Sequence, residues 1–217
     1  MAEKDSFPRR KANAGGETGI PFAGGLRLRY PPQNFFTFLT LPNKIKIGQS
    51  ISLTTAERKL AHFIARNRNR NNRSFNVTNL KISGDDAATV DLEGVCGEIA
   101  FCKLFNVYPD LDTDHEPPHP LHDCVIPPPP GFRIDVKTTK YETGKLLVDA
   151  RKKGKVGGVD YYALMTGSFP GPYTFRGLIA REHIIQPQKL GLLCGYKSYM
   201  AEQSELTDDL PTDPPLF

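Results

Sequence analysis

Residues 132–139 of this 217-residue chain read FRIDVKTT, and this stretch decides the fold that we expect. It alternates apolar with polar residues and is rich in β-formers, the pattern of a strand with one face in the core. Successive side chains of a strand point to opposite faces. Ile134 and Val136 are therefore expected to pack, while Asp135 and Lys137 point together to the other face and are available for chemistry.

Further strands and two helices are predicted on either side of this stretch. Helical spacing appears over about 55–67, behind a capping box formed by Thr54 and Glu57, and over 90–105, with Asp91 as the cap. The strands are expected at 35–41, 44–51, 124–126, 145–150, 160–166, 173–180 and 198–206. The fold class predicted is α/β (α+β), with a mixed β-sheet flanked by helices in a single domain.

The length and composition suit one globular domain with charged ends. The chain is 39% hydrophobic and 24% charged, which excludes disordered and fibrous classes. We expect a flexible basic arm at 1–25, a single domain at 26–205 and an acidic, proline-rich tail at 206–217. Within the domain, a basic helical lead-in covers about 54–73 and the core covers about 90–205.

Two sequence features bear on the compartment. No apolar run approaches the roughly 20 residues of a membrane span, and the N-terminus lacks the apolar stretch of a signal peptide. An intracellular protein that does not bind membranes is therefore expected. The four cysteines have no CxxC spacing, so we expect reduced, mostly buried thiols.

The basic charge is concentrated in the first third of the chain. Up to Arg73 there are 14 Lys and Arg against 4 Asp and Glu, while the remainder has 14 against 20. Such a distribution suits a polyanion, with a solvated basic tail as the alternative. The predicted phosphate contacts are Arg58, Arg66, Arg68, Arg70, Arg73, Arg151, Lys152 and Lys153.

Asp135 and Lys137 form the centre of a candidate active site. Their spacing sets the carboxylate and the ammonium roughly 6 to 7 Å apart along the strand, which leaves room for a metal ion and a water molecule. The carboxylate can ligate a hard cation such as Mg²⁺, and the lysine can position or help deprotonate the water.

Two further acids are candidates for the same site. Glu98 shares a helical face with apolar residues such as Val95 and Cys102, so it needs a cation, a metal ion or a hydrogen-bond network, unless it is a rim acid paired with a nearby Lys or Arg. Asp123 precedes a short strand that would form a hairpin with 132–139 and face Asp135. Other loop acids remain open as substitutes for Asp123, namely Asp110, Asp112 and Asp114.

The succession GEIAFCKLF, HDCVI, GFRIDVKTT, LLVD, VDYYALM and FRGLIAREHI resembles the nuclease core of the PD-(D/E)XK superfamily over about residues 90–205. It is similar in particular to small phage and viral members. The resemblance implies a restriction-endonuclease-like fold and Mg²⁺- or Mn²⁺-dependent hydrolysis of phosphodiester bonds in DNA. By the same resemblance Glu98, Asp123, Asp135 and the Val136 carbonyl would hold the metal, and Lys137 would orient the water. The implied contacts to the substrate are Thr138 and Thr139, and Lys140 is a further predicted contact to nucleic acid.

Two other functions compete with a nuclease. His115, His119 and His122 could collect Zn²⁺, although the prolines between them prevent a helix that would present them together. A non-catalytic nucleic-acid-binding protein with a nuclease-like fold is the second alternative. The sequence leaves open whether a nuclease would be an endonuclease or an exonuclease, and whether the protein is a homodimer.

Overall fold

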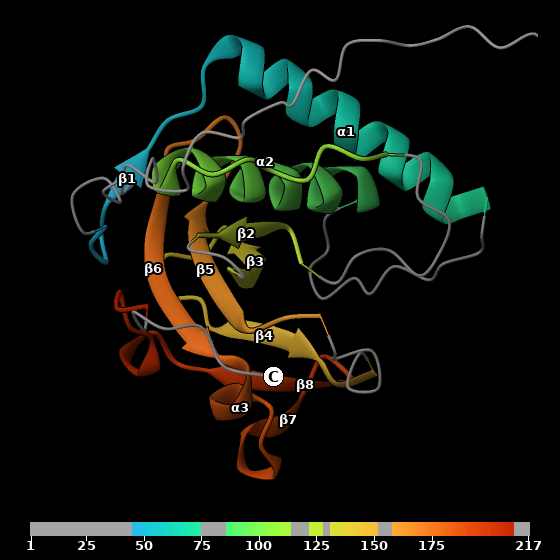
Figure 1. Cartoon of the computed structure of the whole chain (residues 1–217). Helices are drawn as coiled ribbons and strands as arrows, with labels where there is room; N and C mark the ends of the chain where they lie inside the picture. Colours follow the sequence, from blue (N-terminus) through green and yellow to red (C-terminus); the bar gives the residue numbers. More distant parts are fainter. Residues whose placement is uncertain (1–44, 75–85, 114–121, 128–130, 152–157, 211–217) are drawn as a thin grey trace, which may run out of the picture. The chain divides into compact units, whose positions relative to one another are not determined.

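The structure used here is a computed structural model that describes residues 45–74, 86–113, 122–127, 131–151 and 158–210 (Figure 1). All of these residues belong to one compact unit. Its helices are α1 (Thr55–Ser74), α2 (Ala87–Phe105) and the short α3 (Arg181–Ile184). None of the helices in this part of the chain combines the length and the apolar character needed to cross a membrane.

Eight strands form two sheets. The strands are β1 (Ser50–Ile51), β2 (Cys124–Ile126), β3 (Phe132–Thr139), β4 (Leu146–Asp149), β5 (Tyr161–Gly167), β6 (Tyr173–Ala180), β7 (Leu190–Leu193) and β8 (Tyr196–Ala201). The larger sheet has the order β1-β6-β5-β3-β2, with only β3 and β5 parallel. The smaller one is antiparallel, with the order β4-β8-β7. The predicted class, a single α+β domain with a mixed sheet and flanking helices, is confirmed.

Most strand boundaries agree with the sequence patterns. β3 and β6 begin and end where predicted, and β2, β4 and β5 agree to within one residue. The strand expected at 44–51 is reduced to the two residues of β1, and the one expected at 35–41 lies outside the described residues. β8 ends before Gln203–Glu205 because the chain there turns into a 3-10 helix.

β7 was not predicted, because its turn lacks a typical signal. Cys194 and Gly195 both have positive φ, 48° and 84°, between the antiparallel strands β7 and β8. Two-residue hairpin turns with positive φ at both positions usually carry Asn-Gly or Asp-Gly. A cysteine in the first position therefore conceals the hairpin in the sequence.

The larger sheet is covered on both faces. α2, with α1 beyond it, packs on one face, and the smaller sheet lies against the other (Figure 1). Ile134 and Val136 point into the cluster with α2, as the alternation predicted. β5 is buried on both faces, which explains why its sequence is a nearly continuous apolar run. All four cysteines are free thiols, and all but Cys194 are buried.

α1 begins where predicted and ends later. In the capping box the Glu57 N–H donates to Thr54 Oγ1 (3.2 Å) and the Thr54 N–H donates to Glu57 Oε2 (2.6 Å), which confirms that prediction. The helix continues to Ser74, seven residues beyond the predicted end at 67. Tertiary hydrogen bonds from Asn69 to Asp91 and from Asn71 to the Thr113 carbonyl offset the weak helix preference of asparagine.

The start of α2 corrects the expected cap. The Thr89 N–H donates to Asp86 Oδ1 (2.8 Å), so Asp86 caps the helix and Asp91 lies inside its second turn. There Asp91 accepts a hydrogen bond from Asn69 of α1. Because Asp86 and Asp91 both lie near the start of the helix, the sequence did not show which of them is the cap.

The chain stays attached to the sheet beyond residue 205, the predicted end of the domain. Leu206 is buried, and Thr207 and Leu178 of β6 exchange two backbone hydrogen bonds of 2.7 and 2.9 Å. The predicted basic arm, 1–25, and the end of the tail, 211–217, lie outside the described residues.

Gly97 allows α2 to approach β3 closely, and this contact supports a prediction. A Cβ at Gly97 would stand 1.9 Å from Thr138 Oγ1 and 2.9 Å from Thr138 Cβ, so the helix or the strand has to shift. We expect Gly97→Ala to lower the free energy of unfolding by about 1–3 kcal/mol, as overpacking does elsewhere. Chemical denaturation measures the change.

Gly94 of the same helix supplies the matched control. A Cβ there meets nothing within 4 Å. Since alanine is the better helix former, Gly94→Ala is expected to stabilise the protein by up to about 1 kcal/mol. Adding Thr138→Ala to Gly97→Ala should recover part of the loss, and equal stabilities of the two glycine variants would contradict the close-packing argument.

Candidate active site at the edge of the larger sheet

The β2–β3 hairpin brings two acidic residues opposite each other at the edge of the larger sheet. Cys124 pairs with Ile134, so one further step along the ladder sets Asp123 opposite Asp135. The Asp123 N–H donates to the Ile134 carbonyl (2.8 Å), and the Val136 N–H donates to the Asp123 carboxylate (2.6 Å). The predicted hairpin is confirmed, and the Asp123 carboxylate is held against the backbone of β3.

Lys137 and Asp135 interact directly on β3. The Lys137 ammonium donates a hydrogen bond to Asp135 Oδ1. Burial by itself would lower the pKa of Lys137, but the negative charges of Asp135 and Asp123 raise it to about 12. In this arrangement Lys137 stays protonated at neutral pH. It is therefore suited to orient a water molecule or to stabilise negative charge, and not to accept a proton.

Glu98 approaches the same group of charges from α2. Its carboxylate accepts a hydrogen bond from Arg68 of α1 at 2.9 Å, and only 16% of its side chain is exposed. Burial raises the pKa of Glu98; Arg68 and Lys137 lower it in part, and Asp135 raises it further, for a net upward shift. The expectation that this acid faces inward and needs a cation is met by Arg68.

Asp123 carries the least compensated charge of the site. Burial raises its pKa well above the ordinary value, and the negative charges of Glu98 and Asp135 add to this effect. Lys137 and the hydrogen bond from the Val136 N–H oppose the rise without cancelling it. An additional positive charge at this position would relieve the repulsion.

The donor set fits a hard divalent cation in its chemistry. Three carboxylates offer the oxygen ligands that Mg²⁺ and Mn²⁺ take, and their mutual repulsion favours a bound cation. Within the described ranges, however, no three His, Cys, Asp or Glu side chains are already arranged as metal ligands. Asp135 and Glu98 point at Lys137 and Arg68, so metal binding would require these carboxylates to turn.

Arg68 has a different place from the one predicted. Instead of reaching outward to phosphates, it is half-buried between α1 and α2, where it binds Glu98 and the Asp110 carboxylate (3.4 Å). It also donates to the backbone carbonyls of Asp110 (2.8 Å) and Asp112 (3.2 Å). Arg68 thus joins α1, α2 and the loop that leads towards Asp123.

The loop acids considered as substitutes for Asp123 differ in their placement. The Asp110 carboxylate is bound by Arg68. The backbone N–H of Asp110 donates a hydrogen bond to the Asp123 carbonyl (2.9 Å). The Asp112 N–H donates to the Asp110 carboxylate (2.9 Å), which gives the loop a turn of its own. Asp114 lies outside the described residues. Among the described acids of this group, Asp123 is the one that contacts β3.

Three predicted substrate contacts adjoin the end of β3. The Thr138 hydroxyl is buried against Gly97 of α2 and has no hydrogen-bond partner in the described part of the chain, so it does not face a substrate as expected. Thr139 Oγ1 accepts a hydrogen bond from the Tyr141 N–H (3.3 Å). Lys140 is exposed, with its ammonium 5.6 Å from the centre of the Tyr141 ring.

The remaining predicted phosphate contacts lie on other elements. Arg58 is half-buried and donates to Thr55 Oγ1 (3.1 Å). Arg151 is exposed and pairs with Asp149 (2.9 Å). The exposed arginines of α1 are Arg66, Arg70 and Arg73. Lys152 and Lys153 lie outside the described residues.

The zinc alternative falls mostly outside the described part of the chain. His115 and His119 are not described. His122 is described, and its buried Nδ1 has no hydrogen-bond partner among the residues that the structure describes. Burial by itself would raise the pKa of Asp160, but the hydrogen bonds and the charge of Arg133, with a smaller contribution from His122, lower it.

One residue of the site was missed because of a helix boundary. With α1 extended to Ser74, Arg68 continues the buried face of Ala61, Ile64 and Ala65 at spacings of three and four residues. The signal was present in the sequence, but a helix that stops at 67 leaves Arg68 beyond its end.

Comparison with known proteins adds a family but no activity. Residues 43–168 match the model of a protein family described as a family of unknown function (DUF5843). The match includes Glu98, Asp123, Asp135 and Lys137. No curated protein and no solved structure matches the chain.

Proposed function

The chain belongs to the family of unknown function DUF5843, and from the site described above we propose that it is a metal-dependent nuclease that hydrolyses phosphodiester bonds in DNA. One observation carries the proposal: Glu98 of α2, Asp123 just before β2 and Asp135 of β3 interact electrostatically with one another and with the protonated Lys137. Repulsion between partly buried acids costs folding free energy, and groups of this kind are concentrated at functional sites. The succession of helix, strand and strand agrees with the proposed relation to the PD-(D/E)XK superfamily.

The proposal gives each of these residues a part in phosphodiester hydrolysis. Asp123, Asp135, Glu98 and the Val136 carbonyl would hold Mg²⁺ or Mn²⁺. When bound there, such an ion supplies a water molecule of lowered pKa and neutralises charge on the phosphate. Lys137 donates hydrogen bonds to the attacking water or to a phosphate oxygen on which negative charge develops. DNA as the substrate implies an intracellular place of action, which we also propose.

A direct assay tests the proposal. The full chain is incubated with supercoiled, linear and single-stranded DNA and with RNA, in Mg²⁺, in Mn²⁺ and with a chelator. We expect cleavage of DNA that requires the divalent ion and stops with the chelator. If none of these substrates is cut, and DNA is only retained in a salt-sensitive way, the protein is a non-catalytic binding protein and the proposal fails.

The raised pKa of Asp123 predicts how pH and metal act on stability. A carboxyl whose pKa is higher in the folded than in the unfolded state favours folding at low pH, and this contribution is lost as pH rises through the folded pKa. Asp123→Asn is therefore expected to stabilise the metal-free protein relative to the parent, by a margin that grows from acidic to neutral pH. Thermal unfolding from pH 5 to 8 in chelator measures the margin.

Adding Mg²⁺ provides the second half of this test. The ion should stabilise the parent at neutral pH, because it binds only the folded state, and should stabilise Asp123→Asn much less. The asparagine oxygen can still accept the hydrogen bond from the Val136 N–H, so the backbone contact remains. If Asp123→Asn is less stable than the metal-free parent at pH 8, the negative charge of Asp123 is already compensated in the folded protein, and the prediction is wrong.

A further inference from the structure

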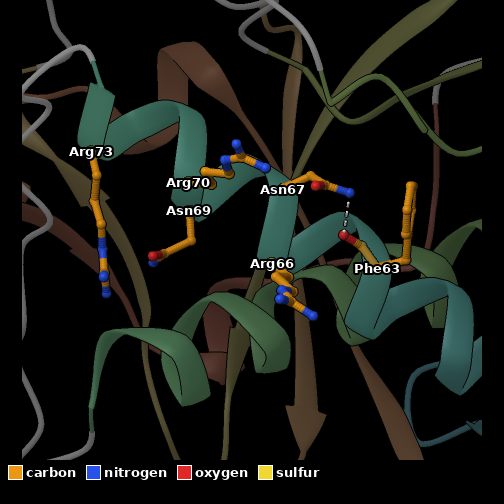
Figure 2. A pocket seen from close by; sticks show the side chains of 6 residues that line it. All are labelled: Phe63, Arg66, Asn67, Asn69, Arg70 and Arg73. Carbon is orange, nitrogen blue, oxygen red and sulfur yellow. Dashed lines mark hydrogen bonds between the residues drawn. The ribbon is translucent and has the colours of Figure 1, made fainter.

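The outward face of α1 borders a hollow of about 550 Å³. Figure 2 shows that all of the labelled lining side chains come from this one helix. The lining residues that the structure describes are Phe63, Arg66, Asn67, Asn69, Arg70 and Arg73.

Helical geometry explains why these residues gather. At about 100° per residue, Phe63, Arg66, Asn67 and Arg70 fall within about 100° of the helix circumference, on the side opposite Arg68. Along the axis Arg66 and Arg70 are about 6 Å apart. Figure 2 also shows the Asn67 amide turned to the Phe63 carbonyl, to which it donates a hydrogen bond of 3.0 Å.

The arginines of this hollow differ from most others in the described part of the chain. Within those residues no carboxylate pairs with Arg66, Arg70 or Arg73, and the lining includes no acid. By contrast, the arginines that do have a carboxylate partner are Arg68, Arg133, Arg151 and Arg176. Three guanidinium groups without acidic partners along one hollow make a strong site for phosphates.

Phe63 adds an aromatic surface to the positive charge. Its side chain is 61% exposed, although it lies in the middle of a helix that buries Ala61, Ile64 and Ala65. The ring therefore adds little to the core and is available for contacts at the surface. An aromatic side chain next to arginines is the combination with which proteins stack an unpaired base and bind the adjoining phosphates.

We propose that this face of α1 is a binding track for a single-stranded nucleic acid, in which Phe63 stacks on an unpaired base while Arg66, Arg70 and Arg73 bind successive phosphates. The inference rests on the proposed nuclease function and names its substrate class. A duplex does not offer the face of a base to Phe63, because its bases are stacked on one another. The preference for an unpaired strand therefore follows from the ring, and the affinity follows largely from the arginines.

The track lies on the opposite side of α1 from the catalytic acids. Arg68 reaches Glu98 from the inner face, and an α-helix with its side chains is about 10–12 Å thick. A strand on the outer face is therefore held some nucleotides away from the bond that is cut. Loss of Phe63 should then raise the KM for long single strands, leave kcat unchanged, and have no effect on oligonucleotides too short to reach the track.

Fluorescence anisotropy in chelator tests binding without cleavage. Labelled single-stranded DNA of 20 nucleotides, the same sequence as RNA and the same sequence as a duplex are titrated with the full chain. We expect Phe63→Ala to weaken binding of the single strands about 5- to 100-fold and binding of the duplex much less. Arg66→Gln with Arg70→Gln should lower the salt dependence for the single strand by about 1.4 in log–log slope.

Further variants separate stacking from other effects. Phe63→Tyr keeps a ring and should bind as the parent does, whereas Phe63→Leu keeps only the apolar surface and should bind as weakly as Phe63→Ala. Leu60→Ala, which also changes a partly exposed apolar residue of α1, should bind normally. Unchanged thermal unfolding confirms that these variants fold. Equal affinity of Phe63→Leu and the parent, tighter binding of the duplex, or full competition by poly-glutamate would overturn the proposal.

Binding and cleavage fail independently in these experiments. If DNA is cut with metal and Phe63→Ala binds single strands as the parent does, the nuclease function stands and the track is refuted. If nothing is cut but single strands bind through Phe63, the track stands and the nuclease function is refuted.

Discussion

We expect Asp135→Asn to lower the proposed metal-dependent cleavage of DNA by a factor of about 10³ or more, while the protein stays folded. The side chain keeps its shape but loses the charge that would hold the metal ion, and metal ions supply several kcal/mol of transition-state stabilisation. Removing this negative charge also relieves Asp123 and Glu98, whose pKa values it raises. Initial cleavage rates in Mg²⁺, compared with those of the parent, measure the loss.

An acid near the end of β3 provides the control for this variant. The side chain of Glu142 is 85% exposed and only approaches Arg176 (3.4 Å), so Glu142→Gln should cleave at the parent rate. Thermal unfolding of Asp135→Asn in chelator should show a midpoint no lower than that of the parent. Cleavage by Asp135→Asn at the parent rate would remove the catalytic role from β3.

Arg68→Ala is expected to lower the free energy of unfolding by about 2–3 kcal/mol. Removing one partner of a buried ion pair commonly costs 3–5 kcal/mol, and residual exposure of both side chains, 24% for Arg68 and 16% for Glu98, reduces this value. The substitution removes the positive charge that pairs with the Glu98 carboxylate. It also removes the hydrogen bonds that Arg68 donates to the carbonyls of Asp110 and Asp112. For a chain of this size the melting temperature should fall by about 5–10 °C.

A double-mutant cycle identifies the cause. Adding Glu98→Gln to Arg68→Ala removes the stranded charge and should recover part of the stability, so the two changes are less than additive. Arg151→Ala disrupts an exposed pair with Asp149, in which 58% of the arginine side chain is accessible, and should change stability by less than about 0.5 kcal/mol. Strict additivity of the first two changes would mean that the Arg68–Glu98 pair contributes nothing.

The regular parts of the fold could be predicted because the hydrophobicity pattern of each segment reflects whether its residues are buried. The sequence of β3 alternates apolar with polar residues and β5 is a nearly continuous apolar run, so period and composition were sufficient. The end of α1 could not be predicted in this way. Asn69 and Asn71 disfavour a helix locally, and their compensating partners, Asp91 and the Thr113 carbonyl, are more than 20 residues away.

The site shows the same division. Spacing along β3 sufficed to put Asp135 and Lys137 on one face, and the hairpin brought Asp123 opposite them. The length of α1 then decided which arginines face outward. In an extended chain Arg66, Arg68 and Arg70 would all point to the same side. In the helix, Arg68 instead points inward to Glu98, and the other two point to solvent.

By itself, the sequence determined the strand that carries Asp135 and Lys137, the buried helix that carries Glu98 and the basic character of the first third of the chain. These properties depend on neighbours within a few residues, where strand and helix periodicity act. The tertiary structure alone decided that Arg68 binds Glu98, that Gly97 lies against Thr138 and that Phe63 borders a hollow with unpaired arginines. Each of these contacts joins distant segments or depends on how far a helix extends, and both are set by packing and charge compensation across the whole domain.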